Sequence, residues 1–361
     1  IEVLNHCAGL AAASAHRMMV VASLIHDERE MDYAQRRAET HSGELDSIEA
    51  FEHLSARVAA GENPYEQFGP NGLEQAIAEV GATPALCQGA QLDQPIEIVR
   101  YYADLLKTYP LTEDLGNIES RGMQHHRWVE KEAGGVVAAI IAYNYPNQLA
   151  LAKLAPALAA GCTVVLKSAP DTPLVTLALG ELIANHTDIP AGVVNVLSGA
   201  DPAVGAALTT SPDVDMVTFT GSTPTGRAIM AAASGTLKKV FLELGGKSAN
   251  ILLPDVDFKT AVTKGVLGMM GNSGQSCDAP TRMLVPNSRI DDVVEAVKSV
   301  KPSLTVGDPT SKVRLGPVVS EPQFEKIQGL IERAINDGAT PVIGAYWLAP
   351  WATCQAKRSF R

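Results

Sequence analysis

The sequence predicts an α/β protein with a doubly wound parallel sheet in its larger domain and a second, smaller α/β unit after it. Short apolar runs bounded by glycines alternate with helical patterns from residue 134 onward, which is typical of strands buried on both faces. One of these strands, predicted at 215–220, runs directly into a glycine turn and a helix. The chain has 361 residues, which is long enough for two domains with cores of their own.

The composition is that of an ordinary globular protein. Hydrophobic residues make up 46% of the chain, charged residues make up 19%, and the net charge is −11. A negative charge of this size argues against a nucleic-acid partner. The apolar runs near Val136 and Leu149 are short or are interrupted by Lys153, so we expect no membrane span.

The cysteines and histidines do not suggest a metal site. The five cysteines are scattered and lack any Cys-x-x-Cys spacing, and the histidines of the first sixty residues also lack metal-ligand spacing. This usage favours a reducing compartment, and therefore a cytoplasmic location, over a disulfide framework or a zinc site. We predict no metal ion.

The first unit, residues 1–72, is predicted to be a helical segment. Ala8–Ile25 and Leu45–Ala60 carry apolar residues at helical spacing, and turn clusters follow them. Neither helix carries residues that point to a particular chemistry.

The second unit, residues 73–244, contains the predicted parallel sheet. Residues 117–132 alternate polar residues with few core-sized ones, which by itself fits a flexible surface loop. Strands are predicted at 134–142, 162–167, 193–197, 215–220 and 240–244, and helices at 73–80, 94–107, 149–160, 174–185, 202–209 and from Arg227.

The third unit, residues 245–344, has fewer predicted strands. They lie at 248–254 and 282–285, with helices at 257–270, 290–299 and 324–337. Residues 345–361 continue no recognisable pattern.

The stretch Gly271–Arg282 surrounds Cys277 with small and turn-forming residues. Glycine and serine neighbours cannot enclose a sulfur, so we expect this thiol to be reachable. A reachable thiol in such a loop is a candidate nucleophile, whereas a lone cysteine in a cytosolic protein is more often structural. The loop taken alone leaves both interpretations open.

Further blocks of sequence identify a family. Tyr143–Pro146, Phe219–Thr223 and Leu242–Lys247 precede the Cys277 loop, and Leu315–Ser320 follows it. Together with that loop they closely resemble the aldehyde dehydrogenase superfamily, from about Gly81 to about Gly344. The blocks occur in the order of the family, so the resemblance does not depend on one motif.

The resemblance implies a catalytic role for three residues of an enzyme that oxidises an aldehyde to a carboxylic acid. Cys277 would attack the aldehyde to form a thiohemiacetal, and the Asn144 amide would stabilise its oxyanion. Glu243 would activate the water that hydrolyses the following thioester. From the residues alone, Asn144 could instead cap the next helix, and Glu243 could be a surface glutamate. The spacing of Glu243 from the glycine turn also fits a ribose-binding acid, but we reject that role because the resemblance gives the ribose position to Lys167.

The resemblance also implies NAD as the cofactor, bound by a Rossmann-like domain. Lys167 would hold the adenosine ribose, and Ser222 would contact the pyrophosphate at the start of a helix. Many relatives carry a glutamate where Pro170 stands, and here the acid is Asp171, so NADP is also possible. The cofactor-binding residues implied are Lys167, Ser222, Gly221, Gly226, Tyr143, Leu244 and Gly245, with Tyr143 replacing the tryptophan that is usual in the family.

The resemblance implies an organisation in which residues 73–244 are the NAD(P)-binding domain and 245–344 an incomplete catalytic domain. Full-length relatives are expected to be homo-oligomers, paired through a hairpin near 117–132. Relatives continue well beyond Gly344, so the chain is expected to be truncated, with a divergent segment at 1–72 and an unmatched tail at 345–361. We therefore expect weak NAD(P) binding and slow turnover from the chain as given.

Two other functions remain open. The first is a CoA-acylating dehydrogenase, which the presence of Glu243 disfavours because relatives of that type usually lack this glutamate. The second is an inactive remnant of an aldehyde dehydrogenase. The sequence does not identify the aldehyde.

Overall fold

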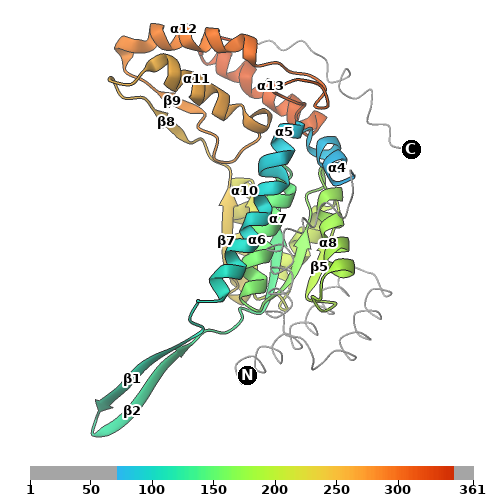
Figure 1. Cartoon of the computed structure of the whole chain (residues 1–361), viewed down its shortest axis with the longest axis vertical. Helices are drawn as coiled ribbons and strands as arrows, with labels where there is room; N and C mark the ends of the chain where they lie inside the picture. The colour runs from blue at the N-terminus through green and yellow to red at the C-terminus, as the bar shows by residue number, and fades with distance from the viewer. Residues whose placement is uncertain (1–70, 345–361) are drawn as a thin grey trace.

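The computed structural model describes residues 71–344 and is built on one parallel sheet (Figure 1). Five strands form this sheet in the order β5-β4-β3-β6-β7. The chain runs outward from β3 in one direction and then from β6 in the other, so β3 and β6 flank the switch point at which open α/β sheets bind ligands. The strands are β3 (Val136–Ile140), β4 (Thr163–Lys167), β5 (Val194–Leu197), β6 (Met216–Gly221) and β7 (Lys239–Leu244).

Helices cover both faces of this sheet, which confirms the predicted doubly wound arrangement. On one face Leu154 and Leu182 pack against Leu166 of β4. On the other face Leu208 and Ile229 pack against strand residues that include those of β6. The first face is covered by α6 (Asp93–Leu106), α7 (Pro146–Ala159) and α8 (Leu174–His186), and the second by α9 (Pro202–Thr210) and α10 (Thr223–Ala233).

β7 differs from the other strands because it is an edge strand with one exposed face. Its residues alternate between exposed and half-buried, and Phe241 remains 51% exposed. In contrast, every residue of β3 and β4 is buried. The side chain of Glu243 therefore lies on the open face of the sheet edge.

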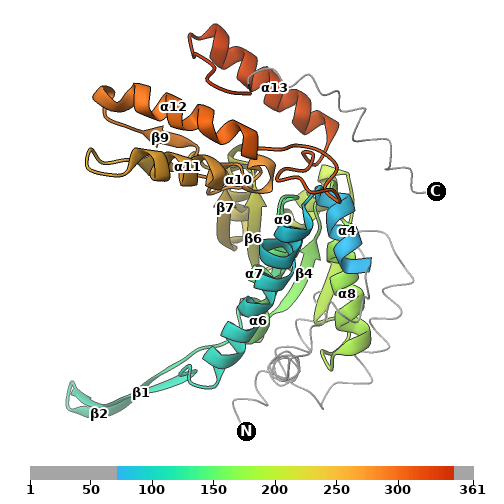
Figure 2. The ribbon, with the colours of Figure 1, turned by 45° about the horizontal axis from the view of Figure 1, so that its top comes forward.

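A second layer follows β7 and has its own small core. β8 (Ala249–Ile251) pairs in parallel with β9 (Arg282–Leu284). α11 (Phe258–Met269) and α12 (Ile290–Val300) pack Val262 and Val266 against Ala296 and Val300. α13 (Glu321–Asn336) buries none of its residues. Figure 2 shows this layer at the end of the molecule away from the hairpin.

An antiparallel hairpin projects from the body between α6 and β3 (Figure 1). It consists of β1 (Thr112–Ser120) and β2 (Met123–Glu130), so it begins before the predicted residue 117. Almost all of its residues are exposed, including Met123 and Trp128. The alternative of a flexible surface loop is therefore wrong.

Three short elements lead into α6. α4 (Asn71–Val80) and α5 (Pro84–Leu86) are followed by the π-helical segment η2 (Cys87–Gln91). Gly89 departs from helical geometry inside η2, with φ −134° and ψ −112°. This segment delivers Gln91 to the interior, where its side chain is 1% exposed.

Several predicted boundaries need correction. α10 begins at Thr223 instead of Arg227, because the Ser222 hydroxyl accepts a hydrogen bond from the Thr225 N–H and caps the helix there. The strand expected at 248–254 is limited to β8, since only those residues pair with β9. The helices predicted at 8–25 and 45–60 and the tail 345–361 lie outside the described residues.

No helix among residues 71–344 is both long and apolar enough to cross a membrane.

Candidate active site

The loop before Cys277 is held in an unusual backbone conformation. It begins in the 3-10 segment η4 (Gly271–Gly274), directly after α11, where Asn272 and Ser273 have φ values of 50° and 56° and Gly274 has 79°. Non-glycine residues in this left-handed region are strained and persist where surrounding contacts hold them. Consecutive left-handed residues turn the chain sharply after α11, and Cys277, which follows this turn, lies at the protein surface.

Gln275 provides much of that support. Its buried side chain donates to the Asn272 carbonyl at 3.0 Å and accepts from the Val319 N–H at 2.9 Å. Ser273 donates to the Gly316 carbonyl at 2.8 Å. The loop is thus tied to itself and to the 316–319 segment by side-chain hydrogen bonds.

The structure brings Asn144 to this same loop. The Asn144 Nδ2 donates to the Gln275 carbonyl at 2.9 Å, two residues before the cysteine. That bond fixes the orientation of the amide, because the opposite orientation would set two oxygens against each other. One hydrogen of the NH₂ group remains for another acceptor. Tyr145, and not Asn144, occupies the N-cap position of α7, so the capping alternative is wrong.

Tyr145 makes a second contact between the same two segments. Its phenolic oxygen lies 2.7 Å from the Ser276 hydroxyl, next to Cys277. Burial raises the pKa of Tyr145, so its hydroxyl stays protonated at neutral pH. The β3–α7 turn and the Cys277 loop are therefore joined at two consecutive residues of each.

Cys277 is exposed, as its Gly/Ser neighbours predict. The two other cysteines among the described residues, Cys87 and Cys162, are buried, and burial raises the pKa of both thiols. Cys7 and Cys354 lie outside the described residues. Within the part of the chain that is described, Cys277 is the thiol that a solvent-borne reagent can reach.

The end of β7 also approaches this loop. A side chain added at Gly246 would meet the Cys277 carbonyl oxygen at 3.2 Å, so the two backbones lie close together. Glu243 lies three positions earlier and is exposed. The segment that follows Glu243 therefore comes close to the Cys277 loop.

Lys153 is a charged residue of this region for which the sequence motifs imply no role. It lies on α7, is buried, and donates from Nζ to the Thr218 hydroxyl at 3.0 Å. Burial lowers its pKa to about 8, while the charge of Glu243 acts in the opposite direction. One feature of the sequence points to the buried position of Lys153: it lies in the middle of an Ala/Leu helix, where a buried charge needs a partner.

Lys167 lies at the C-terminal end of β4, as predicted. Its Nζ donates to the carbonyls of Ser168 at 3.1 Å and Gly199 at 3.2 Å, which joins the ends of β4 and the segment after β5. An ammonium group has three donors, so one remains for a ligand. Burial lowers the pKa of Lys167. Asp171 and Pro170 are exposed in the loop that follows.

The glycine turn after β6 has the geometry of an anion site at a helix N-terminus. Ser222 caps α10, and its hydroxyl lies 2.8 Å from the Thr225 hydroxyl. Gly226 is packed against Leu244: a Cβ atom at Gly226 would lie 2.8 Å from the Leu244 Cδ2. Gly245 donates to the Gly221 carbonyl at 3.2 Å and is exposed. Tyr143 is half-buried, and its main-chain carbonyl accepts a hydrogen bond from the Thr172 hydroxyl at 3.3 Å.

These groups fit the chemistry of a dinucleotide. Lys167 offers a donor to ribose hydroxyls, and the Ser222 and Thr225 hydroxyls sit at the positive end of α10, where a pyrophosphate is favoured. Both positions lie at the C-terminal edge of the sheet, which is the usual ligand edge.

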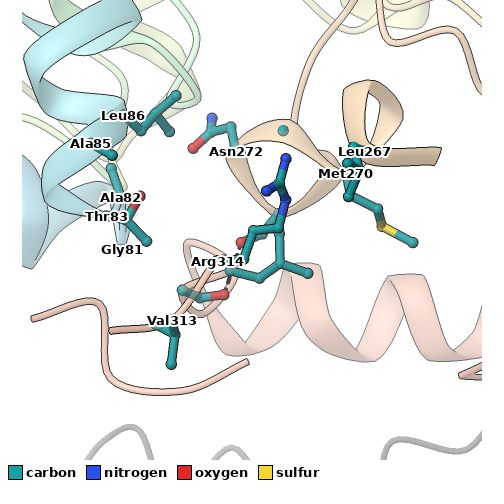
Figure 3. Close-up of a pocket in the computed structure, with 14 residues that line it drawn as sticks. Gly81, Ala82, Thr83, Ala85, Leu86, Leu267, Met270, Asn272, Val313 and Arg314 are labelled. Carbon is teal, nitrogen blue, oxygen red and sulfur yellow. Dashed lines mark hydrogen bonds between the residues drawn. The ribbon is translucent and has the colours of Figure 1, made fainter. Parts of the chain in front are cut away.

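A separate cavity lies behind the Cys277 loop (Figure 3). It has a volume of about 490 Å³ and is bounded by the α4–α5 turn, the end of α11 and residues 313–316. Arg314 extends into it from one side. Cys277 does not line this cavity, so it is not the place where an aldehyde would meet the thiol.

Within residues 71–344, no group of three or more His, Cys, Asp or Glu side chains is arranged to hold a metal ion.

The chain belongs to the aldehyde dehydrogenase family. The sequence model of that family matches residues 71–352. The resemblance therefore extends beyond Gly81 and Gly344, and the expectation that the whole tail 345–361 is unmatched is wrong for residues 345–352. The match includes the whole five-stranded sheet and the Cys277 loop.

Individual relatives agree with this assignment. The chain is 41% identical over 276 residues to a 3-succinoylsemialdehyde-pyridine dehydrogenase of a Pseudomonas species, covering 75% of this chain and 56% of that protein. It is 37% identical over 313 residues to the mitochondrial succinate-semialdehyde dehydrogenase of Arabidopsis thaliana, covering 85% and 58%. The chain spans about half the length of the curated relatives it matches.

Solved structures give the same result. A mutant of aldehyde dehydrogenase C from Pseudomonas syringae, in complex with NAD+ and octanal, is similar with a TM-score of 0.78 and 35% identity, covering 95% of this chain and 65% of that one. An aldehyde dehydrogenase of Mycobacterium tuberculosis in complex with NAD+ has a TM-score of 0.76 and 37% identity, covering 88% and 64%.

Proposed function

We propose that this chain oxidises an aldehyde to a carboxylic acid with NAD+, and that it also accepts NADP+. The observation that carries the proposal is the hydrogen bond from the Asn144 Nδ2 to the Gln275 carbonyl. It holds an amide donor beside the backbone of an exposed cysteine, which is what attack on a carbonyl requires.

Each step of the proposed reaction uses a group of this chain. The Cys277 thiol loses its proton to solvent, the sulfur attacks the aldehyde carbon, and the carbonyl π electrons move to the oxygen. The free hydrogen of the Asn144 amide stabilises that oxyanion, and the Cys277 N–H is the second donor. The oxyanion then collapses to the Cys277 thioester as hydride leaves the former aldehyde carbon, and a bound nicotinamide dinucleotide would supply the hydride acceptor. Glu243 then removes a proton from the water that attacks the resulting Cys277 thioester, which releases the acid and the free thiol.

The exposure of Glu243 supports water as the acyl acceptor. A carboxylate on the open edge of β7 is in contact with solvent, and the positive charge of buried Lys153 acts on it from α7. Transfer to coenzyme A would not need a base at this position, so we favour hydrolysis over CoA acylation.

We also propose that the two domains have the separate roles that the sequence motifs imply. Residues 73–244 would bind the dinucleotide through Lys167 and the Gly221 turn, and residues 245–344 would be part of the catalytic domain. The change from the five-stranded sheet to the β8–β9 pair after β7 supports this boundary. The exposed apolar side chains of the hairpin, such as Trp128, support its use in pairing subunits.

A burst experiment tests the proposed function. Mixing the chain with an aldehyde and NAD+ should give one equivalent of NADH quickly and then slower turnover. Cys277→Ala should abolish both phases and leave NAD+ binding unchanged. Cys162→Ala, which removes a buried thiol, should retain the burst. Turnover in Cys277→Ala would contradict the assignment of the nucleophile.

A further inference from the structure

Gln91 makes a long-range contact with the residue that the proposed function uses as its oxyanion donor. Its Nε2 donates to the main-chain carbonyl oxygen of Asn144 at 2.8 Å, across 53 positions of sequence. Asn272 donates to the same oxygen at 2.8 Å from the Cys277 loop. A carbonyl has two acceptor sites, so these two amides saturate it.

The two contacts act on different parts of the molecule. Asn272 and Gln275 both belong to the Cys277 loop, and they fix Asn144 relative to the cysteine. Gln91 belongs to η2, which precedes α6 in the chain and is separate from the Cys277 loop. Of these three residues, it is therefore the one that fixes the β3–α7 turn from outside the loop.

The local structure around Gln91 has two features that cost free energy of folding and that packing alone does not explain. Its Oε1 is buried without a hydrogen-bond partner, and an unpaired buried acceptor costs about 1–3 kcal/mol. η2 also contains a π-type bond from the Leu92 N–H to the Cys87 carbonyl at 3.1 Å, made possible by the kink at Gly89. Such π segments are frequent at functional sites. An apolar side chain would avoid the unpaired oxygen but could not reach the Asn144 carbonyl with a donor.

We propose that Gln91 is a positioning residue that holds the Asn144 amide where the oxyanion forms. The inference rests on the proposed function, since it acts through Asn144. Losing the Gln91 donor should leave the thiol as exposed and as nucleophilic as before. It should weaken only those reactions of Cys277 that pass through an oxyanion.

Two reagents separate these properties. With p-nitrophenyl acetate, the Cys277 sulfur bonds to the carbonyl carbon and the oxygen takes the π electrons. Collapse then expels p-nitrophenolate and leaves S-acetyl-Cys277, while the thiol proton passes to solvent. With iodoacetamide, the sulfur displaces iodide at a saturated carbon and no oxyanion forms. The ratio of the two rate constants at Cys277, located by peptide mass spectrometry, measures oxyanion stabilisation.

The main variant is Gln91→Met, which keeps the side-chain volume and removes the donor. We expect acylation to slow by about tenfold or more, a part of the 10²–10³-fold that loss of a whole oxyanion donor costs, and alkylation to stay unchanged. Gln88→Met is the matched control, because Gln88 is exposed on the same η2 segment. It should change neither rate. Equal slowing of both reactions in Gln91→Met would indicate a general loss of structure and overturn the proposal.

Two further variants test the route through Asn144. In an Asn144→Ala background, adding Gln91→Met should cause no further loss of acylation, and a full additional loss would contradict the proposal. In Gln91→Glu the carboxylate cannot donate, but the protonated acid can. Its acylation-to-alkylation ratio should therefore recover toward that of the wild type as pH falls, and a pH-independent ratio would contradict the proposal. If the wild-type chain alkylates but never acylates at Cys277, the proposed function fails first, and this inference with it.

Discussion

The five-stranded sheet and the Cys277 loop are stabilised in opposite ways. β3 and β4 are buried along their whole length between two layers of helices, and their contacts are apolar. The Cys277 loop has an exposed cysteine, and side-chain hydrogen bonds from Gln275, Ser273 and Asn272 hold it in place. Apolar burial tolerates small shifts, whereas hydrogen bonds fix distances and directions.

This difference indicates where each kind of substitution should act. Changes in the sheet should alter the free energy of unfolding with little effect on the chemistry of the thiol. Changes at the edge of the sheet and in the loop should alter the reaction with little effect on stability.

Glu243→Gln should slow hydrolysis of the thioester by about 10²- to 10⁴-fold, the usual effect of losing a general base. The burst of NADH should survive, because attack by Cys277 and hydride transfer do not need this base. The free energy of unfolding should change by less than about 0.5 kcal/mol, since the side chain is exposed. Stopped-flow absorbance and urea denaturation measure the two quantities. Equal loss of burst and turnover would indicate that Glu243 positions other groups.

Leu166→Ala should lower the free energy of unfolding by about 2–5 kcal/mol, because Leu166 is fully buried in β4. Alkylation of Cys277 in the folded protein should keep its rate. Ile251→Ala on β8 is the control: this side chain is 66% exposed, and we expect a change below about 0.5 kcal/mol. A similar loss in both variants would show that the layer containing β8 depends on apolar burial as much as the sheet does.

Lys153 lies where the two regions meet and should make stability depend on pH. Its pKa is about 8 in the folded protein and about 10.5 when exposed, so between these values the unfolded chain binds more protons. Stability should therefore rise as pH rises from 8 to 10.5, by on the order of 3 kcal/mol from this group. Lys153→Met should remove that part of the rise, and Lys264→Met, at an exposed lysine of α11, should retain it. Parallel pH profiles for wild type and Lys153→Met would show that the buried ammonium is not destabilised.

The sequence by itself determined the elements that depend on local pattern. The Val/Ala/Ile run that became β3 is apolar throughout, and the run that became β4 is apolar between Thr163 and Lys167. Continuous apolar runs of this kind are typical of strands buried on both faces. The Gly/Ser surroundings of Cys277 predicted its exposure, because small side chains cannot cover a sulfur. The motifs also identified the family, which the match to residues 71–352 confirms.

Tertiary structure decided the contacts that join distant segments. Nothing in the sequence near Gln91 indicates that it reaches Asn144, because the contact depends on the π-helical turn at Gly89 and on the packing that brings the two segments together. The exposed face of β7 also depends on its place at the edge of the sheet, where the apolar side chain of Phe241 is left uncovered. Local pattern fixes which residues can form an element, but the direction of a side-chain hydrogen bond exists only once the whole chain has packed.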